Sequence, residues 1–197
     1  MPINDGVLLL EIQGDVEFNE VLQTWAKREN KTLANLKEGR APLLNSLPAD
    51  TRWFKVMMSK NDLKELQVIN ENACWGILSS DGNMQAVADN LEIFTENPPN
   101  LPHLVIDGAT LTWQTYFDHL VNSLNKFRKK SNEPNHNLTL ILIASSMCGP
   151  YTVLEGNHTA VSLYFKYFKD QPEIEFQPFI SYLGVSQSMP SCEWYHA

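Results

Sequence analysis

Residues 138–165 read LTLILIASSMCGPYTVLEGNHTAVSLYF, and this stretch decides the fold class. The apolar run 138–144 is typical of a strand that is buried on both faces. Gly149-Pro150 predicts a turn, and 151–154 returns as a second strand. Apolar residues then recur at helical spacing and end before Pro172. The order of strand, turn, strand and helix predicts a sheet covered by helices.

The junction between the second strand and the helix is Glu155-Gly156-Asn157-His158-Thr159. Glycine allows backbone conformations closed to other residues and lets a ligand approach closely. The unpaired N–H groups of a helix start, with the positive end of its dipole, favour an anion. Glu155 would then hold a metal ion, a hydroxyl or a cationic group, while His158 can transfer protons. The same residues also fit a simple turn in which Asn157 or Thr159 caps the helix.

The rest of the chain predicts an alternation of strands and helices. Strands are expected at 7–12, 53–58, 75–78, 85–87, 104–106 and 176–183. Helices are expected at 17–27, 33–36, 62–68 and 113–127. The remainder of 30–50 is expected to be irregular because it contains Pro42 and Pro48.

Residues 1–197 are expected to form a single domain, since this length supports one hydrophobic core. The alternative is an N-terminal lobe of residues 1–95 and a core of residues 103–197. The Pro- and Asn-rich segment 95–102 would then be the boundary.

Composition excludes several classes of protein. The formal net charge is −8 and the pI about 5.1, so nucleic acid is a disfavoured partner. The basic run 126–130 is explained by its place at the end of a predicted helix.

Only a short apolar run, 7–10, lies near the N-terminus, so we expect a cytoplasmic protein without a membrane partner. Three cysteines without a paired spacing indicate reduced thiols. His103, His119 and His136 are scattered and predict no metal cage.

The stretch 138–165 resembles the core of the ParB/sulfiredoxin-like superfamily, in which a strand, a glycine turn and a second strand lead into a motif that opens a helix. The matching positions are Tyr151, Leu154, Glu155, Gly156, Asn157, His158 and Ala160. Residues 176–183 are similar to the next strand of that family. Residues 52–56, followed by Asp62 and Leu63, are more loosely similar to its opening strand and helix.

The resemblance implies an α/β or α+β fold, with a mixed sheet and an N-terminal extension. It also implies a nucleotide-phosphate site at the turn, where members of the family bind ATP or CTP. Glu155 would be the acidic position and a ligand of Mg²⁺, Gly156 the turn, and Asn157 and His158 the phosphate-facing pair. Thr159 stands where the family has arginine, which removes a bidentate phosphate donor.

Three further residues depend on the same resemblance. If the sheet is arranged as in the family, Ser145 and Ser146 line the same cleft as Glu155. They also fit ordinary turn residues. Cys148 lies across the preceding turn, and we expect it to be an inert thiol.

Two functions follow as expectations. The first is an intracellular nucleotide- or phosphate-binding protein, acting as an ATP-dependent phosphotransferase or phosphate-ester hydrolase. Glu155 and His158 would be its catalytic residues, and its cofactors would be ATP or another nucleotide, with Mg²⁺. The alternative is a non-catalytic protein-interaction module with a degenerate nucleotide site. In such a module the acidic surface or the aromatic tail 192–196 would contact a protein partner. The other role expected for this tail is to pack back on the domain.

Overall fold

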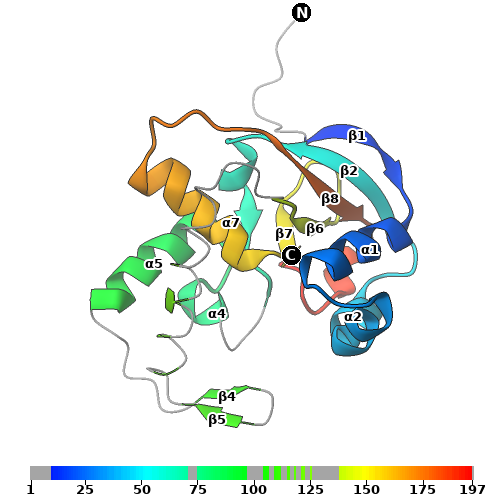
Figure 1. Ribbon diagram of the computed structural model, residues 1–197, viewed down its shortest axis with the longest axis horizontal. Coiled ribbons are helices and arrows are strands. Elements are labelled where there is room, and N and C mark those ends of the chain that lie inside the picture. Colours follow the sequence, from blue (N-terminus) through cyan, green and yellow to red (C-terminus); the bar gives the residue numbers. More distant parts are fainter. Residues whose placement is uncertain are drawn as a thin grey trace, which may run out of the picture.

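The computed structural model describes residues 10–70, 75–96, 104–106, 109–111 and 138–196, together with Thr115, Asp118, Val121, Asn122 and Asn125. Its main feature is one six-stranded sheet (Figure 1). The strands are β1 (Glu11–Val16), β2 (Arg52–Met58), β3 (Leu66–Gln67), β6 (Ile141–Ala144), β7 (Tyr151–Glu155) and β8 (Phe179–Val185).

The sheet is mixed and has the strand order β1-β2-β8-β6-β7-β3. β6 runs parallel to β8 and antiparallel to β7, while β3 is parallel to β7. All four residues of β6 are buried, as the apolar run predicted. Strands from both halves of the chain share this sheet, so the fold is mixed α/β.

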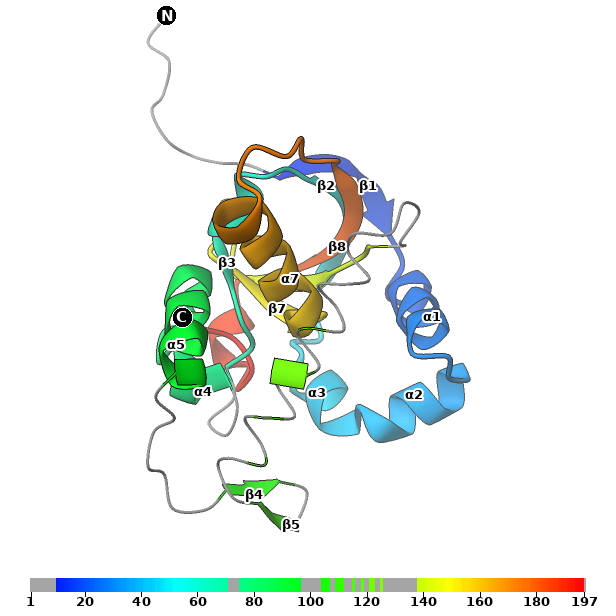
Figure 2. The same ribbon diagram turned by 60° about the vertical axis from the view of Figure 1, so that its left-hand side comes forward.

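Helices cover the sheet from several sides. They are α1 (Phe18–Arg28), α2 (Leu33–Gly39), α3 (Ala41–Ser46), α4 (Trp75–Leu78), α5 (Met84–Glu96) and α7 (Asn157–Tyr164). A π-helical segment, Phe165–Asp170, continues α7, and short 3-10 turns occupy Asp62–Lys64 and Met189–Ser191. In Figures 1 and 2, α7 crosses the sheet with α5 on one side and α1 and α2 on the other. A separate hairpin pairs β4 (Leu104–Ile106) with β5 (Ala109–Leu111).

The predicted strands at 75–78 and 85–87 are wrong, because both segments are helical, in α4 and α5. Their buried residues recur at helical spacing, including Trp75 with Leu78 and Val87 with Leu91. The intervening Asp81-Gly82 therefore connects two helices and not two strands. The side chain of Asn83 accepts a hydrogen bond from the Ala86 N–H at 3.0 Å, which caps α5.

The segment 30–50 is more ordered than its prolines predicted. Thr32 caps α2 by accepting a hydrogen bond from the Asn35 N–H at 3.2 Å. Pro42 lies in the first turn of α3, where its missing N–H costs nothing. The predicted helix at 62–68 is shorter than expected, since a 3-10 turn leads directly into β3.

The helix predicted at 113–127 lies mostly outside the described residues, as do the basic run 126–130 and the segment 97–103. The described positions within 113–127 are helical. Among the helices of the described part of the chain, none has the length and apolar character needed to cross a membrane.

The aromatic tail packs back on the domain, which was one of its two expected roles. Tyr195 and His196 are buried, and the His196 N–H donates to Thr152 Oγ1 at 3.2 Å. The Asn70 N–H also donates to the carbonyl oxygen of Trp194 at 3.1 Å. The tail thus lies against β7 and the segment that follows β3.

Candidate functional site

The strand-to-helix turn has the backbone that its glycine predicted. β7 ends at Glu155, and Gly156 adopts φ 99° and ψ 23°, in the left-handed region. A Cβ atom at this position would lie 2.8 Å from Leu140 Cδ2, so the core leaves no room for a side chain. The Ala160 N–H donates to the Gly156 carbonyl oxygen at 2.8 Å and closes the first turn of α7. Glycine is therefore required here both by conformation and by packing.

The start of α7 has no side-chain cap, because the N-cap residue is glycine. Asn157 does not supply one, since its Oδ1 accepts a hydrogen bond from the Ile69 N–H at 2.9 Å. This bond joins the start of α7 to the segment after β3. Asn157 is thus a structural link whose oxygen is already engaged, which differs from the phosphate-facing role implied by the resemblance. Thr159 is also buried.

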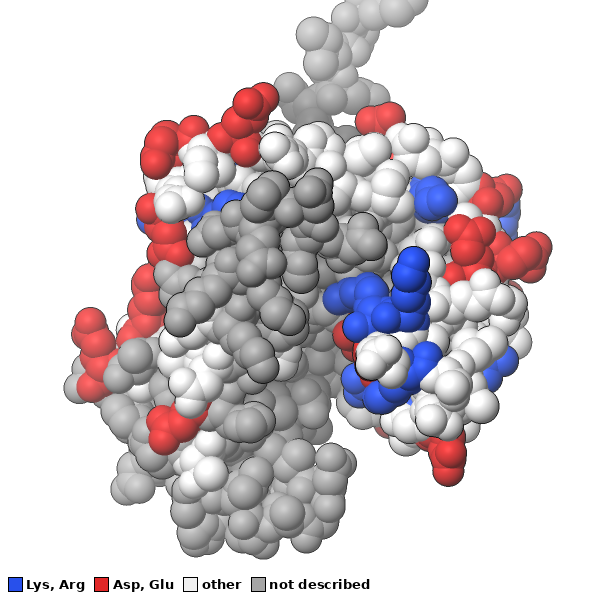
Figure 3. Space-filling view, viewed as in Figure 1, with Lys and Arg blue, Asp and Glu red and all other residues white. Residues whose placement is uncertain are grey.

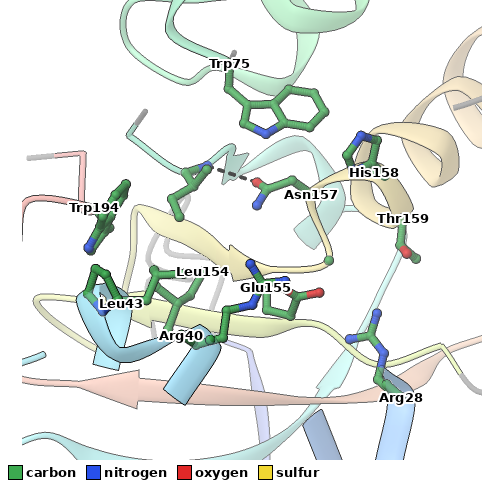
Figure 4. A pocket seen from close by; sticks show the side chains of 14 residues that line it. Arg28, Arg40, Leu43, Trp75, Leu154, Glu155, Asn157, His158, Thr159 and Trp194 are labelled. Atoms are coloured by element: carbon green, nitrogen blue, oxygen red, sulfur yellow. Dashed lines mark hydrogen bonds and ion pairs between the residues drawn. The ribbon is translucent and has the colours of Figure 1, made fainter. Parts of the chain in front are cut away.

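A cavity of about 430 Å³ opens at this turn (Figure 4). Its floor is formed by the end of β7 and the start of α7, from Leu154 to Thr159. The other walls come from segments distant in the sequence. They comprise Arg28, Gly39, Arg40, Pro42, Leu43, Ile69, Trp75 and Trp194.

Two arginines from the N-terminal helices reach this cavity. Arg28 ends α1 and donates a hydrogen bond from Nη1 to the carbonyl oxygen of Thr139. Arg40 lies at the junction of α2 and α3, and its Nη2 is 3.7 Å from Glu155 Oε2. Figure 4 shows both guanidinium groups on the same side of the turn as Glu155. Arginine is therefore present at the site although Thr159 stands at the motif position.

The electrostatic state of Glu155 reflects opposing effects. Burial raises the pKa of Glu155, while the charges of Arg40 and Arg28 act to lower it. Burial also lowers the pKa of Arg28, and the nearby Glu155 and Glu29 partly offset that shift. The carboxylate and the two guanidinium groups therefore stabilise one another in a poorly hydrated site.

His158 lies beside an aromatic ring. Its imidazole meets Trp75 edge to face, with ring centroids 5.1 Å apart and an interplanar angle of 71°. Both residues line the cavity. The histidine predicted as a charge-stabilising group is thus held at the cavity wall by packing against α4.

The surroundings of Glu155 do not fit a Mg²⁺ site. Magnesium in proteins is bound by carboxylates together with water and substrate oxygens. Here the carboxylate faces Arg40 and Arg28, whose positive charges repel a divalent cation. Within the described residues, no group of three or more His, Cys, Asp and Glu side chains is placed to hold a metal ion. The positive charges beside Glu155 therefore disfavour the metal role that the sequence predicted for it.

Ser145 and Ser146 do not meet Glu155, contrary to the expectation that they line its cleft. β6 and β7 are antiparallel, and Glu155 pairs with Ile141 at the start of β6. The two serines follow the end of β6 and therefore lie at the opposite end of this pair of strands. Ser145 Oγ is 3.1 Å from the Tyr195 hydroxyl, and Ser146 Oγ donates to the Gly149 carbonyl oxygen at 3.4 Å. Their roles are to fix the tail and the turn.

The two cysteines among the described residues lie in different parts of the fold. Cys148 is exposed in the turn between β6 and β7, and Cys192 is buried near Ser46, with Sγ 3.4 Å from Ser46 Oγ. Neither residue lines the cavity.

The face of the molecule around the cavity is locally basic in an acidic protein. Figure 3 shows Lys and Arg side chains gathered over α1 and α2, whereas Asp and Glu dominate the periphery of this view. These helices and their flanking turns contribute Lys27, Arg28, Lys31, Lys37 and Arg40. The net charge of −8 therefore conceals a positive region beside the turn.

Sequence reasoning identified the turn but missed Arg28 and Arg40. Arg28 and its acceptor Thr139 are 111 residues apart in the sequence, so no local motif joins them. The available signal was the concentration of Lys and Arg between residues 27 and 40. Comparison of the chain with protein-family models, curated proteins and solved structures finds no match.

Proposed function

We propose that the cavity at the β7–α7 turn binds a phosphate-bearing small molecule, with a nucleotide as the first candidate. One observation carries the proposal: the start of α7, which has no side-chain cap, opens on the same cavity as Arg28 and Arg40. The resemblance to the ParB/sulfiredoxin-like superfamily, which predicts a phosphate at this turn, supports the same ligand class.

The anion would be held by two kinds of donor. Backbone N–H groups of the first turn of α7 combine direct hydrogen bonds with the positive end of the helix dipole. Arginine adds planar donors that match phosphate oxygens. The 3.7 Å contact between Arg40 and Glu155 is longer than a hydrogen bond, so a phosphate bound to Arg40 would not have to displace a strong bond to that carboxylate.

The apolar part of the cavity would hold the body of the ligand. Trp75 and Trp194 lie on the far side of the cavity from Arg28 (Figure 4). Trp75 is buried, so the half-buried Trp194 is the ring that would stack on a nucleobase, since stacking on aromatic side chains is favourable for every base. A volume of about 430 Å³ is typical of a small-molecule site.

Binding of a phosphate would draw a proton onto Glu155. An ionised carboxylate repels the incoming anion, and burial already raises the pKa of Glu155. Phosphate affinity should therefore increase as the pH is lowered, until the phosphate itself takes up a second proton near pH 6. Sulfate, which keeps its charge in this range, separates these two effects.

The test is a titration monitored by intrinsic tryptophan fluorescence, because Trp75 and Trp194 line the cavity. Inorganic phosphate, AMP and ATP are added to wild type, Arg40→Met and Arg52→Met. Arg52 is the matched control, since it is an exposed arginine that does not line the cavity.

We expect Arg40→Met to weaken binding by about tenfold or more, the cost of one charge-assisted hydrogen bond, and Arg52→Met to have little effect. The proposal fails if wild type binds none of the three ligands at millimolar concentration, or if the two variants behave alike.

Phosphoryl transfer or phosphate-ester hydrolysis is a second step of the proposal. Glu155 and His158 are the acid–base groups that line the cavity. In such a reaction His158 would stabilise the charge that develops on the phosphate, and Glu155 would orient the attacking hydroxyl or water. Release of phosphate from ATP that is abolished in both Glu155→Gln and His158→Gln would support turnover. Binding without such release would identify a non-catalytic module.

A further inference from the structure

Glu29 does not line the cavity, but its carboxylate accepts hydrogen bonds from three surrounding side chains. Its Oε1 accepts from Arg40 Nη2 at 2.7 Å and from Arg40 Nε at 3.2 Å. The same oxygen accepts from Trp25 Nε1 at 2.8 Å, while Lys31 Nζ lies 2.5 Å from Oε2. The Glu29 side chain is only 15% exposed, so water competes weakly for these bonds.

These contacts fix the direction of the Arg40 guanidinium group. Its Nε and Nη2 are engaged by Glu29, and its Cζ lies 5.8 Å from the centroid of the Trp25 ring. Its Nη2 also lies 3.7 Å from Glu155. Within the described residues, Nη1 makes no hydrogen bond. Two anchors therefore hold Arg40 at the cavity wall and leave one set of donors available.

The geometry points to Glu29 as the positioning residue of the anion site: it holds Arg40 in the orientation that presents a guanidinium edge to the ligand. This inference rests on the proposed function for the ligand, but the hold of Glu29 on Arg40 is a property of the free protein. Preorganisation of this kind improves affinity, because the long arginine side chain loses less freedom on binding.

The direction in which Glu29→Gln changes phosphate affinity distinguishes a positioning role of Glu29 from a purely electrostatic one. Glu29 is negative and close to the anion site, so electrostatics alone predicts that Glu29→Gln tightens phosphate binding. Positioning predicts the opposite, because a neutral amide holds the guanidinium group less firmly than a carboxylate does.

The first experiment measures inorganic phosphate binding by tryptophan fluorescence in wild type, Glu29→Gln and Glu38→Gln. Glu38 is an exposed glutamate of α2, so its variant controls for the loss of one negative charge. We expect Glu29→Gln to weaken binding about fivefold, and Glu38→Gln to leave it unchanged or slightly tighter. Tighter or unchanged binding in Glu29→Gln overturns the inference.

A double-mutant cycle tests whether Glu29 acts through Arg40. In an Arg40→Met background, Glu29→Gln should have no further weakening effect, since the group that it positions is absent. An equal loss in both backgrounds would show that Glu29 acts by another route and would contradict the inference.

The second experiment uses the ligand-free protein and distinguishes this inference from the proposed function. The ¹⁵N–¹H resonance of Arg40 Nε should be slowly exchanging in wild type and Glu38→Gln, and should move to the position of a free arginine in Glu29→Gln. An unmoved resonance overturns the inference whatever the protein binds. A moved resonance in a protein that binds no phosphate would leave the Glu29–Arg40 link standing and refute the proposed ligand.

Discussion

Replacement of Gly156 by alanine tests the turn at which the site is built. The residue has φ 99°, a left-handed conformation that costs an L-residue about 1–2 kcal/mol. The added Cβ would also lie 2.8 Å from Leu140 Cδ2 in the buried core, where overpacking costs about 1–3 kcal/mol. We therefore expect Gly156→Ala to lower the free energy of unfolding by about 2–5 kcal/mol.

The assay is urea unfolding monitored by tryptophan fluorescence, with Gly39→Ala as the matched control. Gly39 lines the same cavity, but a Cβ there meets nothing within 4 Å and its φ is not positive. Gly39→Ala should leave stability unchanged or increase it by up to about 1 kcal/mol. If Gly156→Ala also stays within about 0.5 kcal/mol of wild type with the same m-value, the reasoning about this turn is refuted.

Three further substitutions test the surrounding structure. Asn157→Ala should cost about 1–3 kcal/mol in urea unfolding, because the Ile69 N–H loses its acceptor; a neutral result would contradict this link. Gly82→Ala should loosen the tail, since the residue has φ 70° and its Cβ would lie 2.5 Å from His196 Nε2; unchanged amide exchange at residues 192–196 would disprove it. Burial would raise the pKa of Glu29, but hydrogen bonds from Lys31, Arg40 and Trp25 outweigh it and lower the pKa to about 2. The stability advantage of wild type over Glu29→Gln, about 1 kcal/mol after solvent screening, should be full above pH 4.5 and vanish toward pH 2; a constant difference would exclude this ionic origin.

The sequence alone predicted those strands and helices in which the apolar residues of the pattern are the residues buried in the structure. The run 138–144 predicted β6 because a segment that is apolar apart from Thr139 is stable only where both faces are covered. The segments 75–78 and 85–87 were misread because Asp81-Gly82 fits a hairpin turn as well as a connection between helices. Short apolar runs leave this choice open, and packing against α7 and neighbouring elements decides it.

The features of the candidate site are likewise of two kinds, those that the sequence predicted and those that only the structure revealed. The sequence by itself determined the turn, because the left-handed backbone that favours glycine at position 156 is a local property of the chain. The close approach of Leu140 to the same position is a tertiary contact that the sequence did not reveal. Only the tertiary structure showed that Arg28 and Arg40 lie near Glu155. It also showed that Ser145 and Ser146 lie at the opposite end of β6 and β7. The hydrogen bond between Asn157 and Ile69 was likewise visible only in the structure. Strand pairing and helix packing set those distances, and both depend on contacts between segments that are far apart in the chain.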